Sequence, residues 1–327
     1  MHKPDYSKGL HKLVEGVYAY LQPRGQWGLS NAGLITDGGQ SLLVDTLFDL
    51  RSTREMLDSM RKAEPAATKR IGTLVITHAN GDHFYGSELV KGAEVICTAT
   101  CAEEMAEAPP QMMEALMKQA PALGSFGQFL IDCFGAFEFK ETNPLPATRT
   151  FVGRMELRVG DKQIQLIEVG PAHTRGDLIV YLPDDKLVFA ADVLFIKSTP
   201  IMWAGPVKNC IAACDLMLDL DVEVVVPGHG PITDKQGVRS VKNYWEFIER
   251  ESRECFHAGL TAEQAAAHID LRDYATWGES ERTVVNVKRL YSSFKGDDSP
   301  ANIADLFVSM AAFANIKQRD KRLLEPG

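Results

Sequence analysis

Short runs of β-branched and aliphatic residues recur along the chain as far as residue 230, and polar or turn-forming residues end most of them. Residues 12–22 predict an opening strand pair, and residues 31–46 predict two strands joined by a turn at Asp37-Gly38-Gly39, which is a hairpin signature. Asp45 ends the second of these strands, and we expect the following turn to expose it. The same pattern predicts further strands at 73–76, 95–98, 155–159, 163–169, 178–182, 186–191 and 222–226.

Helical spacing of apolar residues appears between these strands and dominates the end of the chain. Residues 50–62 and 209–221 are predicted helices between strands. From residue 238 onward the pattern is helical throughout, with Thr261 placed as an N-cap. We therefore expect a strand-rich domain at 1–237 and a helical extension at 238–327 packed on it, with helices at 238–257, 261–268, 279–294 and 300–318.

Residues 101–143 break the strand pattern and are rich in Met and Phe. Pro109-Pro110 punctuates this stretch, and apolar residues at helical spacing follow. One interpretation is a helical insertion whose side chains only pack. The other is a lid whose adaptable side chains line an apolar substrate pocket. The candidate pocket wall consists of Met113, Phe126, Phe129 and Trp203.

Composition narrows the choice of function. The chain has 327 residues, 45% hydrophobic and 24% charged, and its 44 acidic against 35 basic residues give a net charge of −9. An acidic balance without a basic run argues against nucleic-acid binding. No apolar run of about 18 residues predicts a membrane span. The N-terminus lacks the apolar core of a signal peptide, and the six cysteines fall in apolar or helical segments rather than at disulfide-framework spacings, so we expect a cytoplasmic protein.

Polar side chains with metal-binding chemistry follow four of the predicted strands. The first group contains His78, Asn80, Asp82 and His83 within six positions, with Gly81 to let the backbone turn. A turn can carry Asn, Gly and Asp for conformational reasons alone, but two histidines beside it favour a metal site. Three later strands lead to one further candidate ligand each, namely His173, Asp192 and His229. Four of the eight histidines in the chain therefore lie at strand ends.

These motifs resemble those of the metallo-β-lactamase superfamily. That family carries Thr-His-x-His-x-Asp-His after a strand, then a single His, a bridging Asp and a final His in Pro-Gly-His-Gly. Here the segments read Thr77 to His83, then His173, Asp192 and Pro227 to Gly230. The resemblance covers residues 12–235 and implies an α+β fold, an αββα sandwich of two mixed sheets flanked by helices, with metals at one edge.

The resemblance also implies two metal sites and shows one departure. Site one would use His78, residue 80 and His173, and site two would use Asp82, His83 and His229, with Asp192 bridging. The family has His at position 80, whereas this chain has Asn, whose amide oxygen is a weaker and harder ligand. We expect one or two Zn²⁺ ions, with site one weaker or more tolerant of Fe or Mn. Asn80 can also be a residue that holds only a water or a neighbouring loop.

Hydrolysis of a small molecule is the function that the resemblance implies. A bound divalent ion would lower the pKa of its water to about 7, and the hydroxide would attack an ester, lactone, thioester or amide carbonyl. Asp82 and Asp192 are the candidate catalytic carboxylates, since either can accept a proton beside the metal. The alternatives are an iron-dependent oxidoreductase on the same fold and a catalytically decayed metal-binding module.

The predicted partners are a small-molecule substrate and, through the helical extension, a second copy in a homodimer. Trp277 and Tyr291 supply aromatic residues of the kind that interfaces favour, although they can equally belong to the core.

Overall fold

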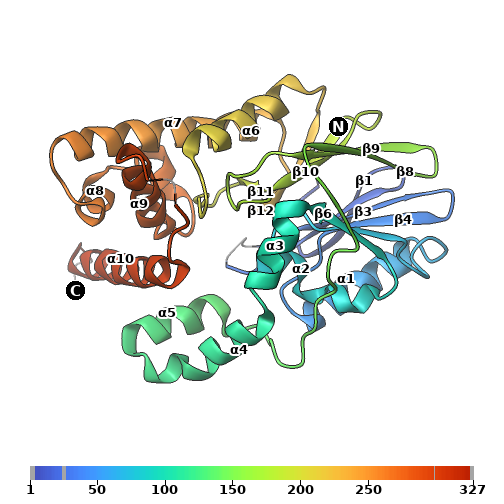
Figure 1. Ribbon diagram of the computed structural model, residues 1–327, viewed down its shortest axis with the longest axis horizontal. Coiled ribbons are helices and arrows are strands. Elements are labelled where there is room, and N and C mark those ends of the chain that lie inside the picture. The colour runs from blue at the N-terminus through green and yellow to red at the C-terminus, as the bar shows by residue number, and fades with distance from the viewer. Residues whose placement is uncertain (1–3, 24–26, 298, 325–327) are drawn as a thin grey trace.

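Two β-sheets packed face to face form the centre of the molecule (Figure 1). The computed structural model describes residues 4–23, 27–297 and 299–324. The seven-stranded sheet runs in chain order: β1 (Gly9–Val14), β2 (Val17–Leu21), β3 (Ala32–Asp37), β4 (Gln40–Val44), β5 (Thr73–Val75), β6 (Glu94–Thr98) and β7 (Arg149–Phe151). The five-stranded sheet has the order β12 (Val224–His229), β11 (Leu187–Phe195), β10 (Leu178–Leu182), β9 (Lys162–Glu168) and β8 (Arg154–Val159). Both sheets are mixed, because β4 to β7 and the pair β11–β12 are parallel while the other neighbours are antiparallel.

Strands that are apolar on both faces explain why the sheets are covered on both sides. In β2 all five residues are buried, with Val17 and Leu21 facing the space between the sheets and Tyr18 facing the helices outside. Strand β10 of the five-stranded sheet repeats this arrangement, since Leu178 faces the seven-stranded sheet and Ile179 faces the helices outside. A strand with two apolar faces must be covered twice, which requires a layer of helices beyond each sheet.

Helices cover both outer faces and complete the predicted αββα sandwich (Figure 1). Helix α1 (Leu50–Ala63) packs its buried Met56, Leu57 and Met60 on the seven-stranded sheet, with Asp49 capping its first turn. Helices α6 (Val207–Asp219) and α7 (Lys235–His257) cover the five-stranded sheet. The α+β sandwich predicted from the sequence is therefore confirmed.

The segment 101–143 is helical, as predicted, and leaves the body of the sandwich. Helix α3 (Ala99–Glu107) begins directly after β6 and is capped by Thr98. Helices α4 (Pro110–Gln119) and α5 (Gly124–Phe134) form a hairpin joined by a short 3₁₀ turn, η2 (Ala120–Ala122). Figure 1 shows this hairpin beside the last helix of the chain, and α5 contacts that helix.

The end of the chain forms four helices on one side of the sandwich (Figure 1): α7, α8 (Ala262–His268), α9 (Arg282–Phe294) and α10 (Ile303–Leu324). Thr261 caps α8 as predicted, and Gln264 completes a capping box. Because α7 packs directly on α6, the extension shares one hydrophobic core with the five-stranded sheet. The division at residue 237 remains a prediction.

One strand was missed, and one expectation about local structure was wrong. The sequence did not predict β7, a three-residue edge strand with two exposed side chains that has too short an apolar pattern to recognise. Gly81 has no positive φ, and instead begins the short helix α2 (Gly81–Phe84). A Cβ atom there would lie 2.6 Å from the Tyr85 ring, so this glycine permits close packing rather than a left-handed turn.

The aromatic residues suggested as interface anchors lie largely inside the extension. Tyr291 is 5% exposed and belongs to the core, and Trp277 is partly buried against Tyr244 and Tyr274. The homodimer therefore remains a prediction without these anchors. Among the described residues, no helix combines the length and hydrophobicity that a membrane span requires.

Candidate metal centre

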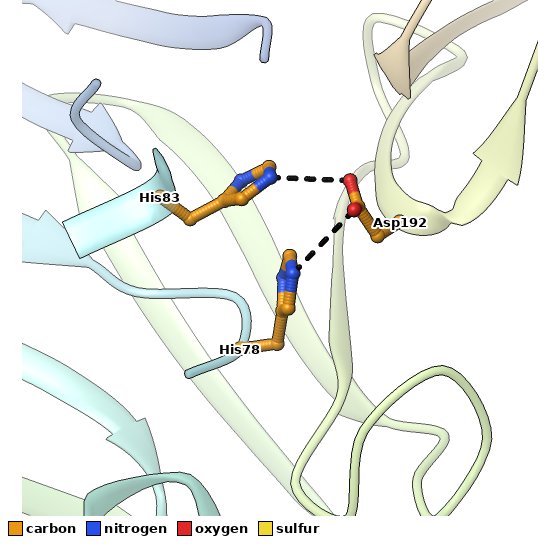
Figure 2. A group of neighbouring side chains, drawn as sticks. All are labelled: His78, His83 and Asp192. Carbon is orange, nitrogen blue, oxygen red and sulfur yellow. Dashed lines mark ion pairs between the residues drawn. The ribbon is translucent and has the colours of Figure 1, made fainter. Parts of the chain in front are cut away.

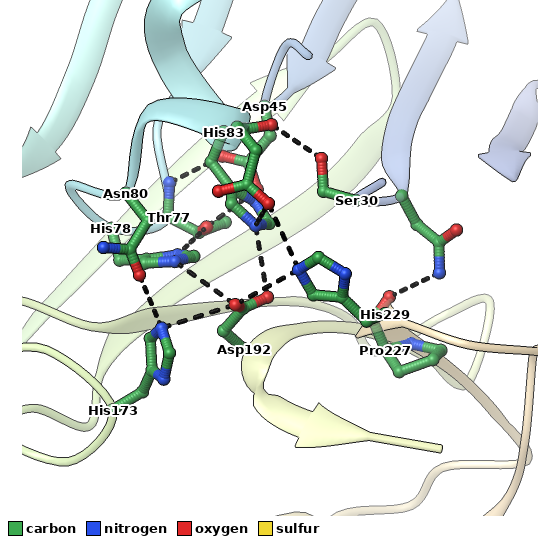
Figure 3. Close-up of polar contacts among 12 residues, drawn as sticks. Ser30, Asp45, Thr77, His78, Asn80, His83, His173, Asp192, Pro227 and His229 are labelled. Atoms are coloured by element: carbon green, nitrogen blue, oxygen red, sulfur yellow. Dashed lines mark hydrogen bonds and ion pairs between the residues drawn. The ribbon is translucent and has the colours of Figure 1, made fainter. Parts of the chain in front are cut away.

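All seven predicted ligands come together at one edge of the sandwich (Figure 3). The loop after β5 and helix α2 carry the first four, the loop after β9 carries His173, and β12 ends at His229. Asp192 was expected at the end of its strand, but β11 continues to Phe195. The strand is irregular around Asp192, where Ala191 has φ +47° and the register with β12 shifts. This bulge turns the Asp192 side chain toward the histidines.

The Asp192 carboxylate lies at the centre of the group. The Nε2 atoms of the four histidines approach its oxygens at 3.1 Å (His83), 3.3 Å (His173), 3.4 Å (His229) and 3.7 Å (His78). Figure 2 shows His78 and His83 pointing at its two oxygens. On the other side, Asp82 lies 3.3 Å from His229 Nε2. Ligand atoms cluster in two sets, His78 with His83 and Asp192, and Asp82 with His83 and His229. Since His83 belongs to both sets, the division into site one and site two stays a prediction.

The sequence predicted the wrong environment for Asp45. It was expected to be exposed, yet it is 2% exposed, because the turn after β4 folds back along β5 and its own N–H donates to Val75 O. Its φ of +61° is one that Asp tolerates better than most residues. Its carboxylate accepts hydrogen bonds from Thr77 N–H (2.8 Å), from the Thr77 hydroxyl (2.7 Å) and from His83 Nδ1 (2.9 Å). Only its position at a strand end marked it in the sequence.

These hydrogen bonds fix which ring nitrogen of each histidine faces the site. His83 Nδ1 must carry the proton because it donates to the Asp45 carboxylate. The Thr77 hydroxyl donates its proton to Asp45, so its oxygen accepts a hydrogen bond from His78 Nδ1 at 3.0 Å. His173 Nδ1 donates to the Ile201 carbonyl at 2.7 Å. In their neutral forms, these three histidines therefore present the Nε2 lone pair to the centre, which is the form that a metal requires.

Buried atoms without hydrogen bonds test whether the residues fit a metal ion. Within the described part of the chain, His78 Nε2, His83 Nε2 and Asp192 Oδ1 are buried and have no hydrogen-bond partner. A buried polar atom without a partner costs about 1–3 kcal/mol. Three such atoms facing one another, from imidazole and carboxylate groups, suit zinc and similar divalent ions. The donor set therefore fits a metal centre.

Asn80 lies at the partly exposed end of this group, with its Oδ1 atom 2.6 Å from His173 Nε2. Because Nδ1 of His173 already donates to a carbonyl, Nε2 of the neutral ring is an acceptor, and so is an amide oxygen. Burial lowers the pKa of His173, which favours that neutral ring. Either the amide is turned to offer its NH₂ group, or a cation takes both lone pairs.

Electrostatics keep the two central carboxylates ionised. Burial raises the pKa of Asp192, but the nearby His229, His83 and His78 outweigh it and hold that pKa well below its usual range. Burial likewise raises the pKa of Asp82, and His83 and His229 bring it below its usual value. The same carboxylates outweigh burial and raise the pKa of His83 and of His229, so protons on these two rings balance the negative charge, and a bound cation would take the place of those protons.

The candidate pocket residues divide into two groups. Trp203 lies beside the centre, since its backbone N–H donates to the backbone carbonyl of His173. Its ring stacks on Phe307 of α10 and contacts the Trp27 ring. Phe129 packs near the extension, whereas Met113 and Phe126 pack against the core of the seven-stranded sheet. Trp27 and Phe307 were missed, because nothing in their local sequence connects two residues 280 positions apart.

Asp45→Asn is expected to weaken metal binding by about 10- to 100-fold, because it removes the charge and the acceptor that orient His83 and, through Thr77, His78. Competition with a chelator measures the change. Asp49→Asn is the matched control, since Asp49 is also buried but caps α1, where Asn serves equally well. Equal metal affinity in the Asp45 variant and the wild type would contradict this role.

A family model for the metallo-beta-lactamase superfamily matches residues 25–229, which include all seven predicted ligands. The chain belongs to this superfamily.

Relatives with different reactions are similar to the chain. Alkyl/aryl-sulfatase BDS1 of Saccharomyces cerevisiae is 22% identical over 91% of this chain and 51% of its own length. Acyl-coenzyme A thioesterase MBLAC2 of Homo sapiens is 25% identical over 67% of this chain and 80% of its own. The structure of the sec-alkylsulfatase Pisa1 from Pseudomonas sp. aligns with TM-score 0.68 at 17% identity, over 91% of this chain and 52% of that one. The chain thus spans about half the length of both sulfatases.

Proposed function

We propose that this protein is a metal-dependent hydrolase of small esters, with the seven converging residues as its metal ligands. The observation that carries the proposal is the set of unpartnered, buried Nε2 and carboxylate atoms around Asp192. The names of the yeast and human relatives, a sulfatase and a thioesterase, support hydrolysis. A bound divalent metal would supply an activated water at neutral pH and polarise the bond to be cleaved.

The chain's own residues supply positioning and proton transfer. His78, His83 and Asp192 would hold the metal from one side, and Asp45 keeps the two rings oriented, directly for His83 and through Thr77 for His78. Asp82 is the more exposed of the two central carboxylates, at 12% of its side chain against 4% for Asp192. Its ionised carboxylate can therefore take a proton from a water at the open end of the site. The rings of Trp27, Trp203 and Phe307 contact one another, and the backbone N–H of Trp203 donates to His173 O, so this aromatic group lies next to one of the predicted ligands.

A carbonyl ester is the first candidate substrate, as the superfamily resemblance implied. A sulfate ester is the second, because the match to the yeast sulfatase covers 91% of the chain and takes in the helical extension, whereas the thioesterase match covers 67%.

Two chromogenic substrates with the same leaving group test both candidates. Protein containing zinc is assayed with p-nitrophenyl acetate and with p-nitrophenyl sulfate, each beside protein stripped by a chelator. We expect metal-dependent release of p-nitrophenol from one of them, and the preferred substrate identifies the ester class. Bound metal without turnover of either would favour a decayed binding module, and iron with oxygen consumption would favour an oxidoreductase.

A further inference from the structure

A cavity of about 530 Å³ lies beside the candidate metal centre. Helix α5, the segment before β3, the start of α1 and helix α10 line it, it opens to solvent, and its volume falls within the roughly 300–1,000 Å³ of small-molecule sites. Its apolar lining includes Trp27, Leu29, Phe129, Phe137 and Ala314. None of the seven predicted metal ligands is among the residues that line it.

One segment, residues 27–31, borders both the cavity and the metal centre. Trp27 and Leu29 line the cavity. The adjacent Ser30 hydroxyl donates to Asp82 O at 2.6 Å, and Asn31 N–H donates to Gly228 O at 2.7 Å, next to His229. The same short segment therefore contributes to the cavity lining and contacts the backbone beside the predicted ligands Asp82 and His229.

Trp27 is held firmly at this boundary. Its indole N–H donates to Glu281 at 2.8 Å, and the Arg282 guanidinium lies 4.3 Å from its ring centre. The ring also contacts the ring of Trp203, whose backbone N–H donates to His173 O. Two contacting rings, Trp27 and Trp203, therefore extend from the cavity toward the part of the chain that is hydrogen-bonded to the His173 backbone.

The charged residues of the cavity already have partners within the protein. Lys8 pairs with Glu55, Arg51 with Asp49, and Glu279 accepts from Ser198. Glu281 accepts from Trp27, and Asp132 accepts from Gln128. The charges are of both signs, and each charged side chain already has a hydrogen-bond or ion-pair partner, so the apolar surface is what the cavity offers to a ligand.

We propose that this cavity binds an alkyl chain of the substrate, while the ester group lies at the metal centre. The inference rests on the proposed function and adds a substrate class, esters with a sizeable hydrophobic group. Each methylene buried on an apolar wall favours binding by about fourfold, so a longer chain should gain affinity until the cavity is full. Helix α5 of the insertion and α10 of the extension contribute to the wall, which gives both appended segments a role in specificity.

A pair of variants on α10 tests the cavity. Ala314 is half-buried and lines it, so Ala314→Phe should fill part of it. Ala312 is exposed on the same helix and is not part of the lining, so Ala312→Phe is the matched control. Calorimetric binding of decanoate and turnover of p-nitrophenyl acetate against p-nitrophenyl decanoate are measured for each protein.

We expect decanoate to bind the wild type and Ala312→Phe alike, and Ala314→Phe at least about tenfold more weakly, which corresponds to fewer than two buried methylenes. In Ala314→Phe, kcat/KM for the decanoate ester should fall by a similar factor while that for the acetate ester stays unchanged. Equal decanoate binding by both variants, or none by the wild type, would overturn the proposal. Absence of turnover of any ester, with decanoate binding as expected, would instead count against the proposed reaction and leave the cavity assignment standing.

Discussion

Replacing His229 or Asp82 with alanine is expected to abolish bound metal and activity together. His229 Nε2 lies between the two central carboxylates, 3.3 Å from Asp82 and 3.4 Å from Asp192. Its ring is held by Phe195, which stacks on it at 5.0 Å with an interplanar angle of 4°. Removing either side chain deletes a strong ligand and leaves the other ionisable groups buried without compensation.

Metal content by mass spectrometry and hydrolysis of the preferred p-nitrophenyl substrate measure this effect in the same preparation. His268→Ala is the matched control, because His268 is exposed on α8 in the helical extension, in none of the clusters of ligand atoms. Circular dichroism verifies that each variant is folded. A folded His229 or Asp82 variant that retains the full metal content would disprove the assignment of that residue as a ligand.

The predictions that held depend on short-range patterns. The hairpin β3–β4 follows from Asp37-Gly38-Gly39 between two apolar runs, and β10 follows from five consecutive apolar residues. The cluster from His78 to His83 is equally local, because a strand delivers it as one unit. His229 could be placed with it because it too ends a strand, and strands of packed sheets can end at a common edge.

The predictions that failed depend on contacts that the local sequence does not contain. Asp45 is buried because its turn folds back along β5, a consequence of pairing between β4 and β5 across 28 intervening residues. Asp192 lies inside a strand because β11 bulges against β12 and then resumes. The aromatic cluster joins Trp27, Trp203 and Phe307 from three distant parts of the chain. Only the assembled fold brings these groups to the candidate centre.

Asn80→His is expected to raise metal affinity at the site that contains His78 and His173 by at least about tenfold, the lower bound for changes around a metal ligand. An imidazole is a strong donor to zinc, whereas an amide oxygen competes poorly with water. The Asn80 side chain is already directed at His173 Nε2, 2.6 Å away, so an imidazole at this position starts close to the remaining ligands. The other predicted ligands keep their oriented, buried positions.

Unequal occupancy of two sites in the wild type follows from the same argument. We expect one tightly bound metal, or two released in separate steps by a chelator, with the Asp82, His83 and His229 side the fuller.

Asn80→Ala distinguishes the two geometries available to Asn80. If the amide oxygen takes part in binding, the alanine variant loses the weaker metal altogether. If the amide only offers its NH₂ group to His173, the alanine variant releases metal as the wild type does, and only Asn80→His changes the titration.

Activity need not rise with affinity in Asn80→His, because a more weakly held ion leaves a coordination position open for water and substrate. Equal and tight occupancy of both sites in the wild type would show that Asn80 does not weaken metal binding. The explanation given for this departure from the family motif would then be wrong.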